Sequence, residues 1–274
     1  MTKHKPIPAR QVIVHSDCWP MATTVAHLVR SVLPGCECEA TYTLPVLLQQ
    51  LSRKPEAALI LCLRPREHLF LFYALKQALL NHPALVISDE LFFSDRLVLK
   101  VYGDIPVQQQ QELTALLTRV QQGELWPGGV RPRMTGKLAD FLSSPAPVTG
   151  FPEVPQIFTS PKRLMNYMAL LIHREMLACG VSPAQIRLLG EVYRGRERLS
   201  GLSGRLNVGE RQIWQDKYRL LVKMGMKNRL RELLYGTRFC QDIQRTPFMT
   251  PEDVEQMRWV ESVKQLNRTG FPGD

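Results

Sequence analysis

The first 125 residues alternate short apolar runs with longer amphipathic segments. Runs rich in Val, Ile and Leu predict strands at 11–15, 40–44, 57–63, 84–88 and 96–103. Segments whose apolar residues recur every three or four positions predict helices at 21–33, 44–52, 67–81 and 107–122. Strands that interleave with helices are typical of a doubly wound α/β fold. We therefore expect a five-stranded parallel sheet within residues 1–125.

The stretch 126–160 interrupts this pattern. Seven of the 20 prolines fall between positions 127 and 161, and four glycines lie among them. Proline fixes φ and lacks an N–H donor, so this composition is unfavourable for a long regular element. We expect a semi-stiff linker that joins two domains.

From residue 161 onward the pattern is helical. One side of a helix over 163–178 carries apolar residues, namely Leu164, Met168, Leu171, Ile172 and Met176. The sequence SPAQ (182–185) places an N-cap Ser, a Pro at the first helical position and a Gln able to reach back, and TPED (250–253) repeats this start signal. We expect a helical domain at 161–240 and a helical extension at 241–274.

Positive charge is concentrated in the second domain. The chain has a formal net charge of +10. Residues 1–125 hold 12 Lys or Arg against 11 Asp or Glu, whereas residues 181–240 hold 13 against 5, a net of +8. Such a local excess is typical of surfaces that meet an acidic partner such as nucleic acid.

The centre of this basic segment has two different faces when it is placed on a helix. Ile213, Leu220 and Met224 fall together as a core stripe, with Leu221 at its margin. The opposite side is basic, amide-bearing and aromatic; it carries Arg211, Gln215, Tyr218, Arg219 and Val222, with Trp214 beside them. Arg and Lys neutralise phosphates, and Gln pairs with adenine in the major groove. The plain alternatives are a solvated charged face and aromatic side chains that pack against a neighbouring helix.

The order of motifs around this helix resembles the helix-turn-helix domain of LuxR/GerE-type (NarL/FixJ-type) transcriptional regulators. VSPAQIRLL (181–189) precedes a short helix ending in GRLNVGE (204–210), and KMGMKNR (223–229) is a close match to the closing motif of that family. The sequence departs from the family pattern at four positions. Gln185 replaces an acidic residue, Gln212 and Asp216 replace Thr and His, and Gly209 replaces an N-cap Ser.

The resemblance implies roles for particular side chains. Trp214, Gln215 and Tyr218 would face the groove of duplex DNA, and Arg211, Lys217, Lys223 and Lys227 would be phosphate contacts. Lys217 lies near the core edge of the helix, so a structural role for a snorkelling side chain is an equal alternative. The last helix, residues 228–234, would form a dimer contact.

The first domain looks similar to the phosphoacceptor receiver domains that accompany such regulators, but it lacks their chemistry. Cys62 stands at the end of the third predicted strand, where the acceptor Asp is expected. Only one acid, Asp17, follows the first strand; Ser88 matches the expected hydroxyl, and Lys100 falls inside a predicted strand. An aspartyl phosphate needs a carboxylate. We therefore expect a degenerate receiver without phosphorylation control.

Other classes of function have little support in the sequence. The six cysteines are scattered, without a C-x-x-C pair or a Cys/His cluster, so we expect neither a metal nor a disulfide framework. No Ser/His/Asp arrangement, P-loop or G-x-G-x-x-G motif appears, so we expect neither an enzyme nor a cofactor. The apolar runs are too short to span a bilayer and the N-terminus lacks a signal-like core, so a cytoplasmic, nucleoid-associated protein is expected.

Two functional hypotheses follow. The first is a sequence-specific DNA-binding transcriptional regulator that acts as a homodimer or as the auxiliary partner of a LuxR-type response regulator. The alternative is a non-DNA-binding adaptor that sequesters or docks onto another regulator.

Overall fold

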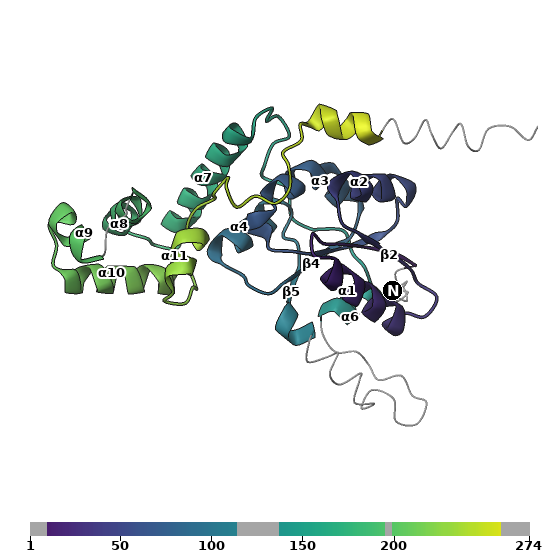
Figure 1. Cartoon of the computed structure of the whole chain (residues 1–274), viewed down its shortest axis with the longest axis horizontal. Coiled ribbons are helices and arrows are strands. Elements are labelled where there is room, and N and C mark those ends of the chain that lie inside the picture. Colours follow the sequence, from purple (N-terminus) through teal and green to yellow (C-terminus); the bar gives the residue numbers. More distant parts are fainter. Residues whose placement is uncertain (1–9, 114–136, 195–198, 259–274) are drawn as a thin grey trace, which may run out of the picture. The chain divides into compact units, whose positions relative to one another are not determined.

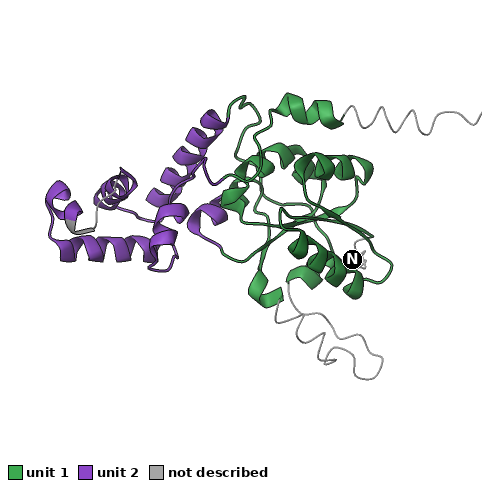
Figure 2. Ribbon diagram, viewed as in Figure 1, with its two compact units in different colours: residues 1–90, 98–160, 244–274 green, residues 91–97, 161–243 purple. Residues whose placement is uncertain are grey.

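The computed structural model of the chain describes residues 10–113, 137–194 and 199–258. These residues form two compact units, shown in different colours in Figure 2. Unit 1 contains residues 10–90, 98–113, 137–160 and 244–258. Unit 2 contains 91–97, 161–194 and 199–243.

Unit 1 is built on a five-stranded parallel sheet with the strand order β2-β1-β3-β4-β5. The strands are β1 (Gln11–His15), β2 (Glu37–Thr41), β3 (Ala58–Cys62), β4 (Ala84–Ser88) and β5 (Val107–Gln109). Every residue of β3 and β4 is buried, which agrees with their unbroken apolar sequences ALILC and ALVIS. The predicted doubly wound α/β fold is therefore confirmed.

Helices cover both faces of this sheet (Figure 1). They are α1 (Trp19–Val32), α2 (Leu44–Arg53), the short 3-10 helix η1 (Pro65–Glu67), α3 (Leu69–Asn81), α4 (Phe93–Val101) and α6 (Lys137–Ser143). α1 and α6 pack on one face, where Val14 and Ile60 share a core cluster with Leu28 and Phe141. α2 and α3 lie on the other side.

The fifth strand does not lie where the sequence pattern placed it. Residues 96–103 were expected to form a strand, but they belong mainly to α4 and to the turn after it. Leu97, Val98, Leu99 and Val101 are all buried, and only Arg96 and Lys100 are exposed along 96–101, so the nearly continuous apolar run resembles that of a buried strand. A local start signal is present, because the carboxylate of Asp95 accepts a hydrogen bond of 2.8 Å from the N–H of Phe92.

Two further element boundaries differ from the prediction. The second strand begins at Glu37, three residues before the predicted start. β5 occupies Val107–Gln109, the start of the segment predicted to be a helix at 107–122, and helical backbone follows over 110–113. Residues 114–122 of that predicted helix lie outside the described residues.

Much of the predicted linker is packed polypeptide. Residues 137–160 belong to unit 1, where Leu138 and Leu142 of α6 join the core. Further on, the N–H of Gly150 bonds the carbonyl of Gly103, and the N–H of Glu153 bonds that of Val101 at 2.8 Å. Backbone hydrogen bonds and buried apolar side chains thus fix a proline-rich stretch without a long regular element.

Unit 2 is helical. Its helices are α7 (Pro161–Ala178), α8 (Pro183–Arg194), α9 (Leu199–Leu206), α10 (Glu210–Lys223) and α11 (Leu230–Gly236). The apolar side predicted for α7 is buried as expected. The start signal at Thr250 is also confirmed, because Thr250 and Asp253 exchange hydrogen bonds ahead of a helix over 251–258, which belongs to unit 1. No helix among the described residues is long and apolar enough to cross a bilayer.

Candidate nucleic-acid interface

The boundaries of α10 follow from two glycines. Gly209 takes the N-cap position with φ −64° and ψ 150°, and Gly225 has φ +59° just past the C-cap Met224. The N–H of Gly225 bonds the carbonyl of Val222 at 3.0 Å, and that of Met226 bonds the carbonyl of Leu221 at 2.9 Å. This pair of bonds is a Schellman motif, which ends the helix at the predicted position.

One face of α10 is buried against α8 and α9. Ile213 forms a core cluster with Leu188 of α8 and Leu202 of α9. Leu220, Leu221 and Met224 are also buried. The predicted core stripe is therefore confirmed, and it fixes which side of α10 faces solvent.

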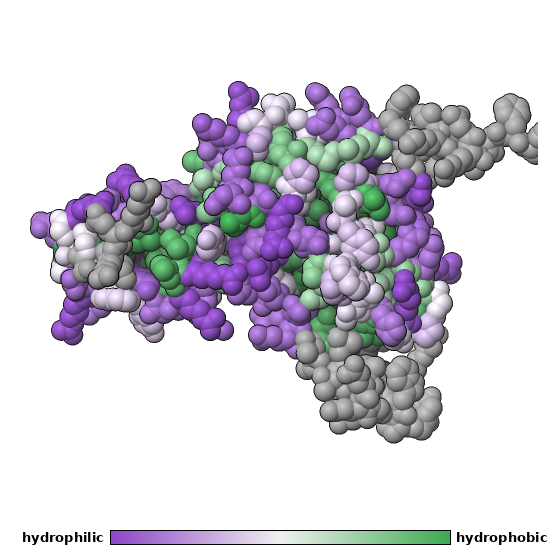
Figure 3. Space-filling view, viewed as in Figure 1, coloured by the Kyte–Doolittle hydropathy of each residue, from purple (hydrophilic) through white to green (hydrophobic). Residues whose placement is uncertain are grey.

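The opposite face of α10 presents the side chains that the sequence pattern placed there. Arg211 and Gln215 are exposed, and Trp214 and Tyr218 are 50% and 58% exposed. Val222, which follows four residues after Tyr218, is exposed as well. Burying large apolar side chains is favourable, so two exposed aromatic rings on one helix face stand out. On the side shown in Figure 3, hydrophilic residues cover most of the surface near α10, at the lower left.

Lys217 does not belong to this exposed face. It is 6% exposed, and its Nζ lies 4.6 Å from the centroid of the Trp214 ring. Burial lowers the pKa of its ammonium group below the ordinary value. The sequence left a phosphate contact and a structural role open for Lys217. The geometry favours the structural role, because the ammonium faces the Trp214 ring.

A polar junction joins the start of α8 to the end of α10. Ser182 and Gln185 form the predicted capping box, with the N–H of Ser182 bonded to Gln185 Oε1 at 3.0 Å and the N–H of Gln185 bonded to Ser182 Oγ at 3.3 Å. Gln185 Nε2 donates to the carbonyl of Asp216 on α10 at 3.2 Å. Lys223 Nζ donates to the carbonyl of Gly180 and to Gln185 Oε1.

A further exposed cation, Lys227, lies just past the end of α10. The side chain of Lys227 is exposed, and its backbone N–H bonds the carboxylate of Glu232 in α11 at 2.6 Å. Arg211, Lys223 and Lys227 are thus accessible on unit 2, whereas Lys217 is not.

No protein-family model and no curated protein sequence matches the chain. Among solved structures, it is similar to RcsB in a structure of two RcsB dimers bound to two parallel DNAs, with 15% identity, a TM-score of 0.49, and coverage of 83% of this chain and 97% of that one. It is also similar to a complex of the two-component response regulator RcsB with DNA, at 16% identity and a TM-score of 0.48, with the same coverage. FixJ from B. japonicum matches at 13% identity and a TM-score of 0.30, over 82% of this chain and 93% of that chain.

At the carboxyl edge of the sheet in unit 1, the position expected for a phosphoacceptor holds Cys62. This residue ends β3 and is buried, and burial raises the pKa of its thiol above the ordinary value. Ser88 ends β4, and its hydroxyl donates to the carbonyl of Glu90 at 2.7 Å. Lys100 lies in α4 instead of a strand, and Gln110 follows β5. A cavity of about 220 Å³ lies at this edge, lined by Cys62, Ser88 and Gln110 among others.

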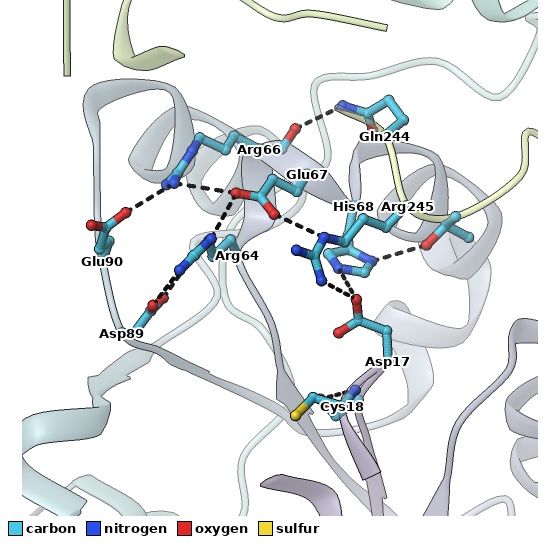
Figure 4. A network of polar contacts seen from close by, with 12 residues as sticks. Asp17, Cys18, Arg64, Arg66, Glu67, His68, Asp89, Glu90, Gln244 and Arg245 are labelled. Atoms are coloured by element: carbon cyan, nitrogen blue, oxygen red, sulfur yellow. Dashed lines mark hydrogen bonds and ion pairs between the residues drawn. The ribbon is translucent and has the colours of Figure 1, made fainter. Parts of the chain in front are cut away.

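The acids around this cavity are held in ion pairs, which Figure 4 shows. Arg245 contacts Asp17 at 2.7 Å and Glu67 at 3.0 Å. Arg64 contacts Asp89 at 2.5 Å and Glu67 at 3.2 Å. Burial alone would raise the pKa of Asp17, but the hydrogen bond and the charge of Arg245 hold it below its ordinary value.

The segment that brings Arg245 to this edge was not anticipated. Gln244 bonds η1 and the start of α3, since its Nε2 donates to the carbonyl of Arg66 at 2.7 Å and its Oε1 accepts from the N–H of Leu69 at 2.9 Å. Thr246 Oγ1 lies 3.0 Å from His68 Nδ1. The partners are about 175 or more positions apart in the chain, and no local pattern signals such contacts. Within the described residues, no group of three His, Cys, Asp or Glu side chains could hold a metal ion.

Proposed function

We propose that this chain is a sequence-specific DNA-binding transcriptional regulator, with α10 as its recognition helix. The observation that carries the proposal is the exposed side of α10, where Arg211, Trp214, Gln215 and Tyr218 stand together while the other side is locked into a helix-turn-helix core. A helix of this kind, presented by a preceding scaffold helix, fits the major groove.

The side chains on this face match two kinds of contact. Gln215 has the donor and acceptor needed to pair with the edge of adenine, and Trp214, Tyr218 and Val222 offer apolar contact to thymine methyl groups. Arg211, Lys223 and Lys227 are the phosphate contacts that we propose, and the net charge of +8 over residues 181–240 supports them.

We further propose that this activity does not depend on phosphorylation. Cys62 cannot form an aspartyl phosphate, and Asp17, Glu67 and Asp89 are engaged by arginines. A phosphate donor such as acetyl phosphate is therefore expected to leave duplex binding unchanged.

The protein would act as a dimer, either with a second copy or as the auxiliary partner of a related response regulator. Leu230 at the start of α11 is 61% exposed, and it provides an apolar side chain on the helix that the sequence resemblance assigns to dimer contact.

Fluorescence anisotropy with a labelled duplex, over about 50 to 200 mM salt, tests the proposal. Wild-type protein should bind with an affinity that falls steeply as salt rises. Gln215→Ala should alter the ranking of different duplex sequences, while Gln77→Ala, which removes an exposed glutamine from α3, should leave that ranking unchanged. Absence of duplex binding, alone or with a related regulator, would refute the proposed function and favour a role as a protein-binding adaptor.

A further inference from the structure

Gln185 of α8 bonds both the segment before its own helix and two residues of α10. It is only 3% exposed. Its Oε1 accepts hydrogen bonds from the N–H of Ser182 at 3.0 Å and from Lys223 Nζ at 3.2 Å. Its Nε2 donates to the backbone carbonyl of Asp216, in the middle of α10, at 3.2 Å. The amide of Gln185 therefore caps α8, bonds the backbone of α10 and positions the side chain of Lys223.

This set of contacts requires an amide. A carboxylate could accept from Ser182 and Lys223, but it has no hydrogen to give to the Asp216 carbonyl. Two oxygen acceptors would then face each other in a buried place, which is costly. An apolar side chain of the same size could fill the space but would make none of the three bonds.

Because the amide of Gln185 is neutral, it bonds Lys223 without neutralising the positive charge of the ammonium group. The two acceptors of Lys223 Nζ are the carbonyl of Gly180 and the amide oxygen of Gln185, and both are neutral. Within the described parts of the chain, no carboxylate lies within 4.0 Å of this ammonium group. Lys223 is exposed, and an ammonium group has three N–H donors, so one remains beyond these two bonds.

We propose that Gln185 is a positioning residue that aims Lys223 at a phosphate of bound duplex while leaving its charge uncompensated. This inference rests on the proposed function. Gln185 sets the direction of the lysine through one hydrogen bond and sets the angle of α10 through another. A glutamate at the same place would keep the first bond but would neutralise the lysine with an ion pair.

The salt dependence of duplex binding separates these effects, because each phosphate contact contributes about 0.9 to the slope of log affinity against log salt. Gln185→Glu should lower this slope by about 0.9, the contribution of one phosphate contact. Lys223→Gln should lower the slope by the same amount, and the double variant should show no further decrease. The loss of affinity between about 50 and 200 mM salt would then be about threefold smaller than for wild type. Gln185→Met is the matched control: it removes the hydrogen bonds of the amide but adds no carboxylate, so affinity should fall while the slope stays above that of Gln185→Glu.

Folding of each variant is checked by far-ultraviolet circular dichroism before binding is compared. If the wild type binds and Lys223→Gln lowers the slope but Gln185→Glu does not, Gln185 does not control the lysine charge and the inference fails. If neither variant changes the slope, Lys223 meets no phosphate and the inference fails as well. Failure of the wild type to bind any duplex would instead refute the proposed function.

Discussion

His68 provides a quantitative test of how unit 1 is held together. It is 2% exposed at the start of α3, its Nδ1 lies 3.0 Å from Thr246 Oγ1, and its Nε2 lies 3.7 Å from Asp17. Burial lowers its pKa from 6.5 to about 4, with Arg245 acting in the same direction and Asp17 opposing it. His68 is therefore neutral in the folded chain at pH values where an unfolded chain would protonate it.

This difference makes unit 1 sensitive to acid. Between pH values of about 6.5 and 4 the unfolded chain binds a proton that the folded chain does not, so stability falls as the pH falls. For one histidine with these two pKa values, acidification from about pH 7 to about pH 5 costs about 2 kcal/mol. His15, whose pKa is also lowered to about 4 by burial and by His68, adds a loss in the same direction.

Hydrogen–deuterium exchange of peptides from β1 and β3 measures the effect in unit 1 itself. When the pH is lowered from 7 to 5, the free energy of opening should decrease in both proteins, and the decrease should be about 2 kcal/mol smaller in His68→Gln than in the wild type. His27→Gln, which removes an exposed histidine of α1, should behave like the wild type. An equal loss in His68→Gln and wild type would refute the assignment of a buried neutral imidazole at this position.

Two further substitutions test the description of α10. Lys217→Met should leave the salt slope of duplex binding unchanged, because the ammonium faces the Trp214 ring. For stability, the lost cation–π contact of about 0.5–2 kcal/mol should be partly offset by removing a buried charge. A slope lowered by about 0.9 would show that this lysine meets a phosphate. Gly225→Ala should lower the free energy of unfolding of unit 2 by about 1–2 kcal/mol in a urea titration, since φ is +59° at this position. The control Gly204→Ala in α9, where a Cβ would meet open space, should instead be neutral or stabilising. Equal effects of the two substitutions would contradict the left-handed cap at Gly225.

Local signals in the sequence predicted much of unit 2. Ser182 and Gln185 were expected to cap α8, and Gly225 was expected to stop α10; both predictions are confirmed by hydrogen bonds. Such signals work because a helix end leaves backbone groups unpaired, and only a few residue types satisfy them within three or four positions. The exposed face of α10 was predictable for a similar reason, since the period of a helix divides core from surface.

Long-range contacts explain what the sequence did not reveal. The segment 97–101 is buried on nearly all sides, so periodicity could not distinguish the helix α4 from a strand. Lys217 sits at the core edge of α10, where the contact of its ammonium group with the Trp214 ring, and not the residue type, determines whether its charge reaches solvent. The ion pair of Arg245 with Asp17 joins residues 228 positions apart, which no window along the sequence can show.

The central claim, that the outward face of α10 selects a DNA sequence, is tested most directly by selecting duplexes from a random-sequence pool with the full chain. Wild-type protein should enrich one sequence motif, and Gln215→Ala should change the base preferred at one position within it while keeping the rest. If the wild type enriches no motif over the starting pool, or if Gln215→Ala enriches an identical one, the face formed by Trp214, Gln215 and Tyr218 does not read DNA.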